Sequence, residues 1–154
     1  MRTIKFRGKS KQGEWVIGYY VGKSSLDEVA ILPPPNVNYD IGYINDSECY
    51  YCIADTLGQF TGLYDCDGKE IYEGDILRFG NSPSGVCEVK WNESLAAFCI
   101  QFFFENKVGT RTLGEWVICE RKVEVIGNIF DNPELLKGGK MKLQDYTTMQ
   151  QRIF

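Results

Sequence analysis

Short runs of β-branched and aromatic residues, separated by glycine, are the feature that most constrains the fold of this chain. Such runs occupy residues 14–21, 86–91, 97–104 and 123–130, and 16 glycines divide the sequence at turn-like intervals. Val, Ile, Tyr, Phe and Trp favour strands, and strands that recur every eight to twelve residues or so are typical of small sandwiches and barrels. The pattern predicts an all-β protein with a small SH3-like barrel rather than a parallel α/β sheet.

The first part of the chain contains two expected strands. In the first, Ile4 and Phe6 alternate with Lys5 and Arg7, so the apolar pair is expected inside and the two cations on the wet face. The second strand, within residues 14–21, is apolar on both faces, which predicts a strand that is covered on both sides.

Two tight turns are expected in the middle of the chain. Asp67 precedes Gly68, and Glu73 precedes Gly74. Glycine accepts the positive φ that such turns demand, so each pair is expected to join two strands.

The core of the barrel is predicted from alternation. Cys87, Val89 and Trp91 alternate with more polar neighbours, which is typical of a half-buried strand. Two more strands are expected at residues 116–119 and 123–130. The predicted core residues are Val89, Trp91, Val125 and Ile129.

A short helix is expected to close the barrel region. Asn132 is a good N-cap, Pro133 suits the first helical position, and Gly138 ends the helix after one or two turns. The predicted organisation has three parts: an additional N-terminal β region packing on the barrel (residues 1–56), the SH3-like barrel region (residues 57–136), and a C-terminal tail or short helix (residues 137–154).

Composition excludes several kinds of chemistry. The chain has no His, which excludes Ser-His-Asp and Cys-His couples and a neutral imidazole base. Phosphate-binding glycine patterns are also absent from the sequence. We therefore expect no catalytic residues, no enzymatic activity and no cofactor. No apolar run approaches the roughly 18 residues of a membrane helix, and no signal peptide is recognisable, so we expect a cytoplasmic protein in a bacterial host, without a membrane partner.

The six cysteines are expected to be reduced thiols, and three of them lie in apolar strand-like runs where they are expected to serve as small core residues. Cys49 and Cys52 have the spacing of a ligand pair, but a structural zinc needs four ligands and no second pair or His completes the set. The acids between Asp65 and Asp75 do not match the spacing of a calcium loop, and we interpret them as turn formers. We therefore predict no metal site.

Charge is unevenly distributed along the chain. The formal net charge is −4 and the pI about 4.9. Residues 1–25 contain six bases and one acid, whereas residues 26–93 contain three bases and thirteen acids. These opposite charges either cancel within one monomer or meet between subunits, and together with the aromatic content of 14% they favour a homo-oligomer.

A basic stripe in the opening strand is the candidate contact site. Lys5, Arg7, Lys9 and Lys11 share one parity along an extended strand, provided that Gly8 keeps the register. Such a stripe can follow a phosphate backbone. The alternative is a solvated strand face, which the low pI favours, because nucleic-acid-binding domains are usually basic.

Three segments carry a family resemblance. The central one joins residues 58–63 to Asp67-Gly68-Lys69-Glu70-Ile71-Tyr72-Glu73-Gly74-Asp75-Ile76. The flanking ones are residues 4–9 with 13–16 at the start, and residues 125–136 at the end. Together they resemble the YopX family of small phage and prophage proteins. The resemblance implies a phage or prophage origin and an all-β fold containing an SH3-like barrel, and it carries over no catalytic residue and no established activity.

We therefore expect an accessory protein that binds without catalysis, to another protein or to itself. The alternative is a nucleic-acid-binding protein that uses the basic N-terminal strand.

Overall fold

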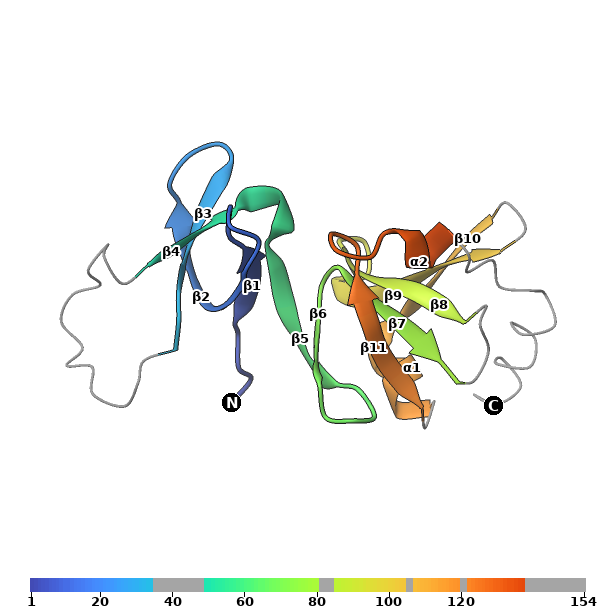
Figure 1. The fold of residues 1–154 in the computed structure, drawn as a ribbon. Helices are drawn as coiled ribbons and strands as arrows, with labels where there is room; N and C mark the ends of the chain where they lie inside the picture. Colours follow the sequence, from blue (N-terminus) through green and yellow to red (C-terminus); the bar gives the residue numbers. More distant parts are fainter. Residues whose placement is uncertain (35–48, 81–84, 105–106, 120–121, 138–154) are drawn as a thin grey trace. The chain divides into compact units, whose positions relative to one another are not determined.

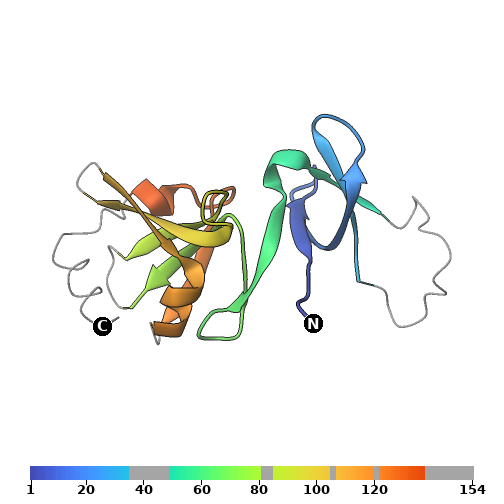
Figure 2. The same cartoon turned by 180° about the vertical axis from the view of Figure 1, so that it is seen from behind.

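The computed structural model describes residues 1–34, 49–80, 85–104, 107–119 and 122–137 (Figures 1 and 2). The chain forms two compact units, Met1–Phe60 and Thr61–Phe154. Strands dominate both units, so the all-β prediction is confirmed. The expected C-terminal tail or helix lies outside the described residues except for Lys137.

The first unit is a curled antiparallel sheet in the order β4-β3-β2-β1-β5. A bridge between Ser10 and Cys52 brings the end of β1 against β4, so the sheet wraps around a small core. Val29, Ile31 and Cys52 form this core. The elements are β1 (Phe6–Lys9), β2 (Trp15–Lys23), β3 (Glu28–Leu32), β4 (Tyr50–Ile53), the short 3-10 helix η2 (Ala54–Thr56) and β5 (Gly58–Tyr64), which continues into the second unit.

Two glycines allow the strands of this unit to approach closely. A Cβ on Gly8 would lie 2.8 Å from the Cβ of Cys52, and a Cβ on Gly18 would lie 2.1 Å from the carbonyl oxygen of Leu32. Both distances are too short for real atoms, so a side chain at either position would displace β1 or β2.

The predictions for the first two strands need correction. Ile17 and Tyr19 of β2 are 42% and 44% exposed, because the core covers the strand only on the opposite face, near Val16 and Gly18. The prediction that the strand is covered on both sides is therefore wrong. Ile4 is 55% exposed, since β1 begins two residues later, at Phe6. Phe6 itself is half-buried.

The second unit contains a five-stranded antiparallel sheet in the order β10-β9-β8-β7-β11 (Figure 1). Consecutive strands form a meander, and β11 then returns to pair with β7. The sheet is open, with β10 and β11 at its edges. The elements of the unit are β6 (Glu70–Tyr72), β7 (Asp75–Phe79), β8 (Val86–Asn92), β9 (Ala97–Phe104), β10 (Lys107–Thr112), α1 (Leu113–Cys119), β11 (Val123–Asn128) and α2 (Glu134–Lys137).

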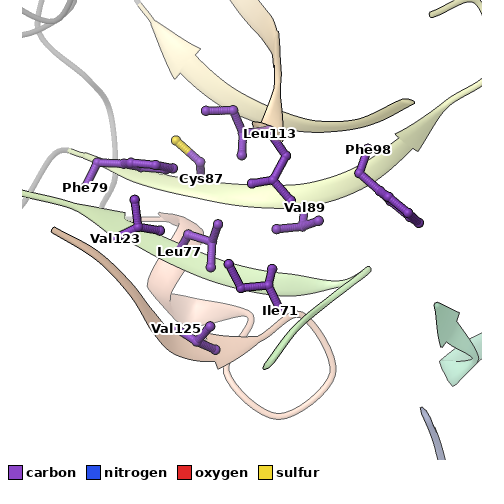
Figure 3. Packing of buried hydrophobic residues seen from close by; sticks show 10 residues of the cluster. Ile71, Leu77, Phe79, Cys87, Val89, Phe98, Leu113, Val123 and Val125 are labelled. Atoms are coloured by element: carbon purple, nitrogen blue, oxygen red, sulfur yellow. The ribbon is translucent and has the colours of Figure 1, made fainter. Parts of the chain in front are cut away.

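Side chains from four strands of this sheet, from β6 and from α1 meet in one core (Figure 3). Val89 and Val125 are buried as predicted, whereas Ile129 lies beyond β11 and is half-buried. The core residues are Ile71, Leu77, Phe79, Cys87, Val89, Phe98, Ile100, Leu113, Val123 and Val125.

Strand β8 differs from the prediction in two ways. It is buried on both faces over its first half, because Val86 and Glu88 are buried as well as Cys87 and Val89. Trp91 is 44% exposed, so its expected burial is wrong. The residue lies one position before the strand ends, past the part of β8 that the core covers.

The expected strand at residues 116–119 is wrong, because α1 spans Leu113–Cys119. Leu113 is completely buried in the core, and Val117, four residues later, packs against the same cluster. That spacing places both side chains on one face of a helix. The predicted short helix after Asn132 is confirmed as α2. No helix in the described part of the chain is long and apolar enough to cross a membrane.

The two predicted turns are confirmed by their glycines. Gly68 and Gly74 have φ values of +81° and +82°, a conformation that disfavours residues with a side chain. Gly68 lies between β5 and β6, and Gly74 lies between β6 and β7.

Asp65 organises the first of these turns and holds it against β11. Its Oδ1 accepts hydrogen bonds from the backbone N–H groups of Asp67 (2.9 Å) and Lys69 (2.8 Å), and its Oδ2 accepts one from Val125 (3.1 Å). Burial alone would raise the pKa of the Asp65 carboxyl, but the three N–H donors outweigh it and lower the pKa below 3.8. Asp65 is therefore a turn former, as interpreted from the sequence.

Candidate binding surfaces

The basic stripe predicted from the sequence is only partly brought together. Arg7 and Lys9 lie in β1, and Lys5 immediately precedes it. Gly8 keeps the register, since it pairs with Val16 of β2. The three cations therefore share the face of the sheet that points away from the core.

Each of these three cations lies over an aromatic ring. The Cζ of Arg7 lies 4.9 Å from the centre of the Trp15 ring, and the Nζ of Lys9 lies 5.9 Å from it. The Nζ of Lys5 lies 5.0 Å from the centre of the Phe60 ring. Contacts of this kind contribute about 0.5–1 kcal/mol at exposed sites. Instead of extending into water as expected, the Lys5 and Arg7 side chains are half-buried.

Lys11 belongs to a different environment. It lies in the turn after β1 and forms an ion pair with Glu28 of β3. The hydrogen bond to the Glu28 carboxylate, followed by its charge, raises the pKa of Lys11. The fourth member of the predicted stripe is therefore held by an ion pair with β3 and does not lie beside the other three cations.

The same face of β2 contributes exposed apolar side chains. Lys9 lies opposite Trp15 and Arg7 lies opposite Ile17, and Tyr19 follows two residues along β2, on the same side. We refer to Lys5, Arg7, Lys9, Trp15, Ile17 and Tyr19 as the outer face. The sequence did not mark Ile17 and Tyr19 as surface residues, because an apolar strand was expected to be covered on both sides.

A second group, in which Trp91 and Leu95 are exposed and Phe98 is buried, lies at the end of the β8–β9 hairpin. Trp91 pairs with Phe98 across the two strands, and their rings meet edge to face with centres 5.1 Å apart. Leu95, in the turn, is 55% exposed. We refer to Trp91, Leu95 and Phe98 as the hairpin cluster.

The turn of this hairpin is fixed by local hydrogen bonds. The N–H of Leu95 donates to Oδ1 of Asn92 at 3.0 Å, and the N–H of Ala96 donates to the carbonyl oxygen of Glu93 at 3.2 Å. Ala96 has a φ of +47°, which is left-handed and uncommon for a residue with a side chain.

The cysteines that suggested a ligand pair differ in their surroundings. Cys52 is buried in the core of the first unit, where burial raises its pKa, and Cys49 is half-buried. Within the described residues, no group of three or more His, Cys, Asp or Glu side chains is arranged to hold a metal ion. Cys87 and Cys99 are buried among apolar side chains, as expected for core residues, whereas Cys66 is exposed.

Comparison with known proteins identifies the family. The family model described as YopX protein matches residues 5–137. Among solved structures, the chain is similar to protein EF1440 from Enterococcus faecalis at 23% identity, covering 88% of this chain and 99% of that one with a TM-score of 0.43. No curated protein sequence matched. Because the family model covers most of the chain, this protein belongs to the YopX family.

Proposed function

We propose that this protein is a cytoplasmic phage or prophage accessory protein that works by binding, without catalysis, and that the hairpin cluster contacts another protein or a second copy of the chain. The exposure of Trp91 and Leu95 at the rigid end of one hairpin carries the proposal. Tryptophan is enriched among the residues that dominate protein interfaces, where it fills a pocket of the partner.

The surroundings of the hairpin cluster fit an apolar centre with a polar rim. The Glu73 carboxylate borders the hairpin cluster, because it accepts a hydrogen bond from the backbone N–H of Trp91 at 3.3 Å. Interfaces commonly combine such a centre with charged residues at the edge. The hydrogen-bonded turn also reduces the entropy lost when Leu95 is ordered by a partner.

Self-association is the form of binding that the charge distribution favours. The first 25 residues are basic and the following 68 are strongly acidic, so unlike regions of two copies attract each other at low ionic strength. The SH3-like barrel expected over residues 57–136 would provide the scaffold. The antiparallel sheet and the hydrogen bond from Cys66 N to Val123 O, which ties the β5–β6 turn to the edge of β11, support that topology.

Capture from phage-infected cells tests the proposal, with tagged full-length protein and with nuclease added or omitted. Trp91→Ala and Leu95→Asp should lose a nuclease-resistant protein partner, whereas Val108→Asp, a change at a 58% exposed apolar residue of β10, should retain it. Light scattering at micromolar concentration and low salt reports the alternative partner, a second copy. A monomer in light scattering, combined with capture that the Trp91 and Leu95 variants leave unchanged, would contradict the proposal.

A further inference from the structure

The outer face combines cations and apolar side chains without an acid in either strand. The sequence of β1 is Phe-Arg-Gly-Lys, and the nine residues of β2 include one Lys and no Asp or Glu. The cations repeat every second residue, which in a strand corresponds to about 6.8 Å. Their row lies beside the row of Trp15, Ile17 and Tyr19 on the neighbouring strand.

The cations of this face are positioned before any ligand arrives. Trp15 supports Arg7 and Lys9, and Phe60 supports Lys5. A half-buried side chain held over a ring has already lost much of its rotational freedom, so binding an anion orders it at lower cost. Tyr19, by contrast, is 44% exposed and offers its ring to a ligand.

We propose that the outer face binds single-stranded nucleic acid, with Lys5, Arg7 and Lys9 at the phosphates and a base stacked on Tyr19. This goes beyond the proposed function, because it assigns a second ligand class to a different surface in the other unit. A single strand supplies both components of the match, a phosphate row and flat rings. A duplex keeps its base faces stacked, and an acidic peptide supplies the negative charge without rings.

The charge of the whole chain limits the strength of this binding. At −4 the protein as a whole repels a polyanion, so the local attraction of the outer face must act over distances near the Debye length, about 10 Å at 0.1 M salt. Three phosphate contacts on a single strand give a slope of log affinity against log salt of about −2, which is a loss of about 20-fold between 50 and 200 mM salt.

Fluorescence anisotropy tests the inference with a labelled oligothymidylate of about 12 nucleotides. We expect saturable binding of the full-length protein in low salt, with the salt dependence above and weaker binding of a duplex of equal length. Arg7→Gln combined with Lys9→Gln should abolish the binding. Lys69→Gln combined with Lys137→Gln removes the same charge from exposed positions of the second unit and should retain it.

A second pair of variants separates stacking from charge. Tyr19→Ala should weaken binding about tenfold, the effect of losing one stacked base, whereas Tyr19→Phe keeps the ring and should bind like the parent protein. Polyglutamate at equal charge concentration should compete poorly. Three results would each overturn the inference: no binding in low salt, an equal loss of binding in the Arg7/Lys9 and the Lys69/Lys137 double variants, or full competition by polyglutamate. None of these results bears on capture through the hairpin cluster.

Discussion

Replacing Asp65 with Asn changes one oxygen of a buried carboxylate to an NH₂ group and removes its charge. The remaining oxygen can still accept from Asp67 and Lys69, but Val125 N–H then faces a donor. An unsatisfied buried donor costs about 1–3 kcal/mol, and hydrogen bonds to a charged group are stronger than neutral ones. We expect Asp65→Asn to lower the free energy of unfolding by about 2 kcal/mol.

Asp65→Ala removes all three acceptor contacts and should cost about 4 kcal/mol, near the upper end for single substitutions. Urea unfolding followed by circular dichroism measures both. For a slope of about 2 kcal/mol/M, the Asn variant should shift the midpoint by about 1 M. Asp67→Asn is the matched control, because Asp67 is exposed and contributes its backbone N–H, not its carboxylate, to the turn.

The pH dependence gives an independent check. Because the pKa of Asp65 is lowered in the folded state, its ionised form stabilises the protein fully above the unfolded value of about 3.9, and this stabilisation is lost as the pH falls through the folded pKa. The advantage of the parent protein over Asp65→Asn should therefore be constant near neutral pH and shrink in acid. An Asn variant as stable as the parent, or a difference that does not change with acid, would refute the reasoning.

Three further predictions concern the two cores. Gly18→Ala should destabilise the first unit by at least 1–3 kcal/mol or so, because its Cβ would overlap the Leu32 carbonyl, whereas Gly22→Ala enters open space and should be neutral or slightly stabilising in thermal unfolding. Leu113→Ala should cost about 2–5 kcal/mol in the same assay, since it empties a fully buried site; a change below 0.5 kcal/mol or so would argue against α1 in the core. Burial raises the pKa of Cys87 to about 12, so iodoacetamide at mildly alkaline pH should modify exposed Cys66 first and reach Cys87 only on unfolding, as mass spectrometry of digests will show.

The parts of the fold that the sequence predicted depend on short-range rules. Gly68 and Gly74 mark turns because positive φ is a property of a single residue, and Asn132 marks a helix start because capping involves neighbouring residues. Alternation also identified Cys87 and Val89 as members of one buried row. These predictions needed no knowledge of distant contacts.

Helix α1 shows where such rules stop. Its residues Val117 and Ile118 favour strands, and the segment was expected to be one. The structure makes it a helix because Leu113 and Val117 then reach the same core cluster. The four-residue spacing of that pair is visible in the sequence. Whether it favours a helix depends on a core that strands distant in the sequence form.

The exposed apolar and aromatic members of the two candidate surfaces were missed for a related reason. Alternation shows which side chains share a face of a strand. Whether that face is buried depends on whether other strands or helices of the chain pack against it. In the described part of the first unit, only Val29, Ile31 and Cys52 form the fully buried cluster. This cluster covers β2 on one face near Val16 and leaves Ile17 and Tyr19 exposed on the other face. In the described part of the second unit ten residues form one buried cluster, yet β8 extends past them at Trp91. Aromatic side chains occur both in interiors and at interfaces, so residue type alone could not distinguish Tyr19 and Trp91 from core residues. The size of the core in each unit determines which aromatic side chains remain exposed and available to a ligand.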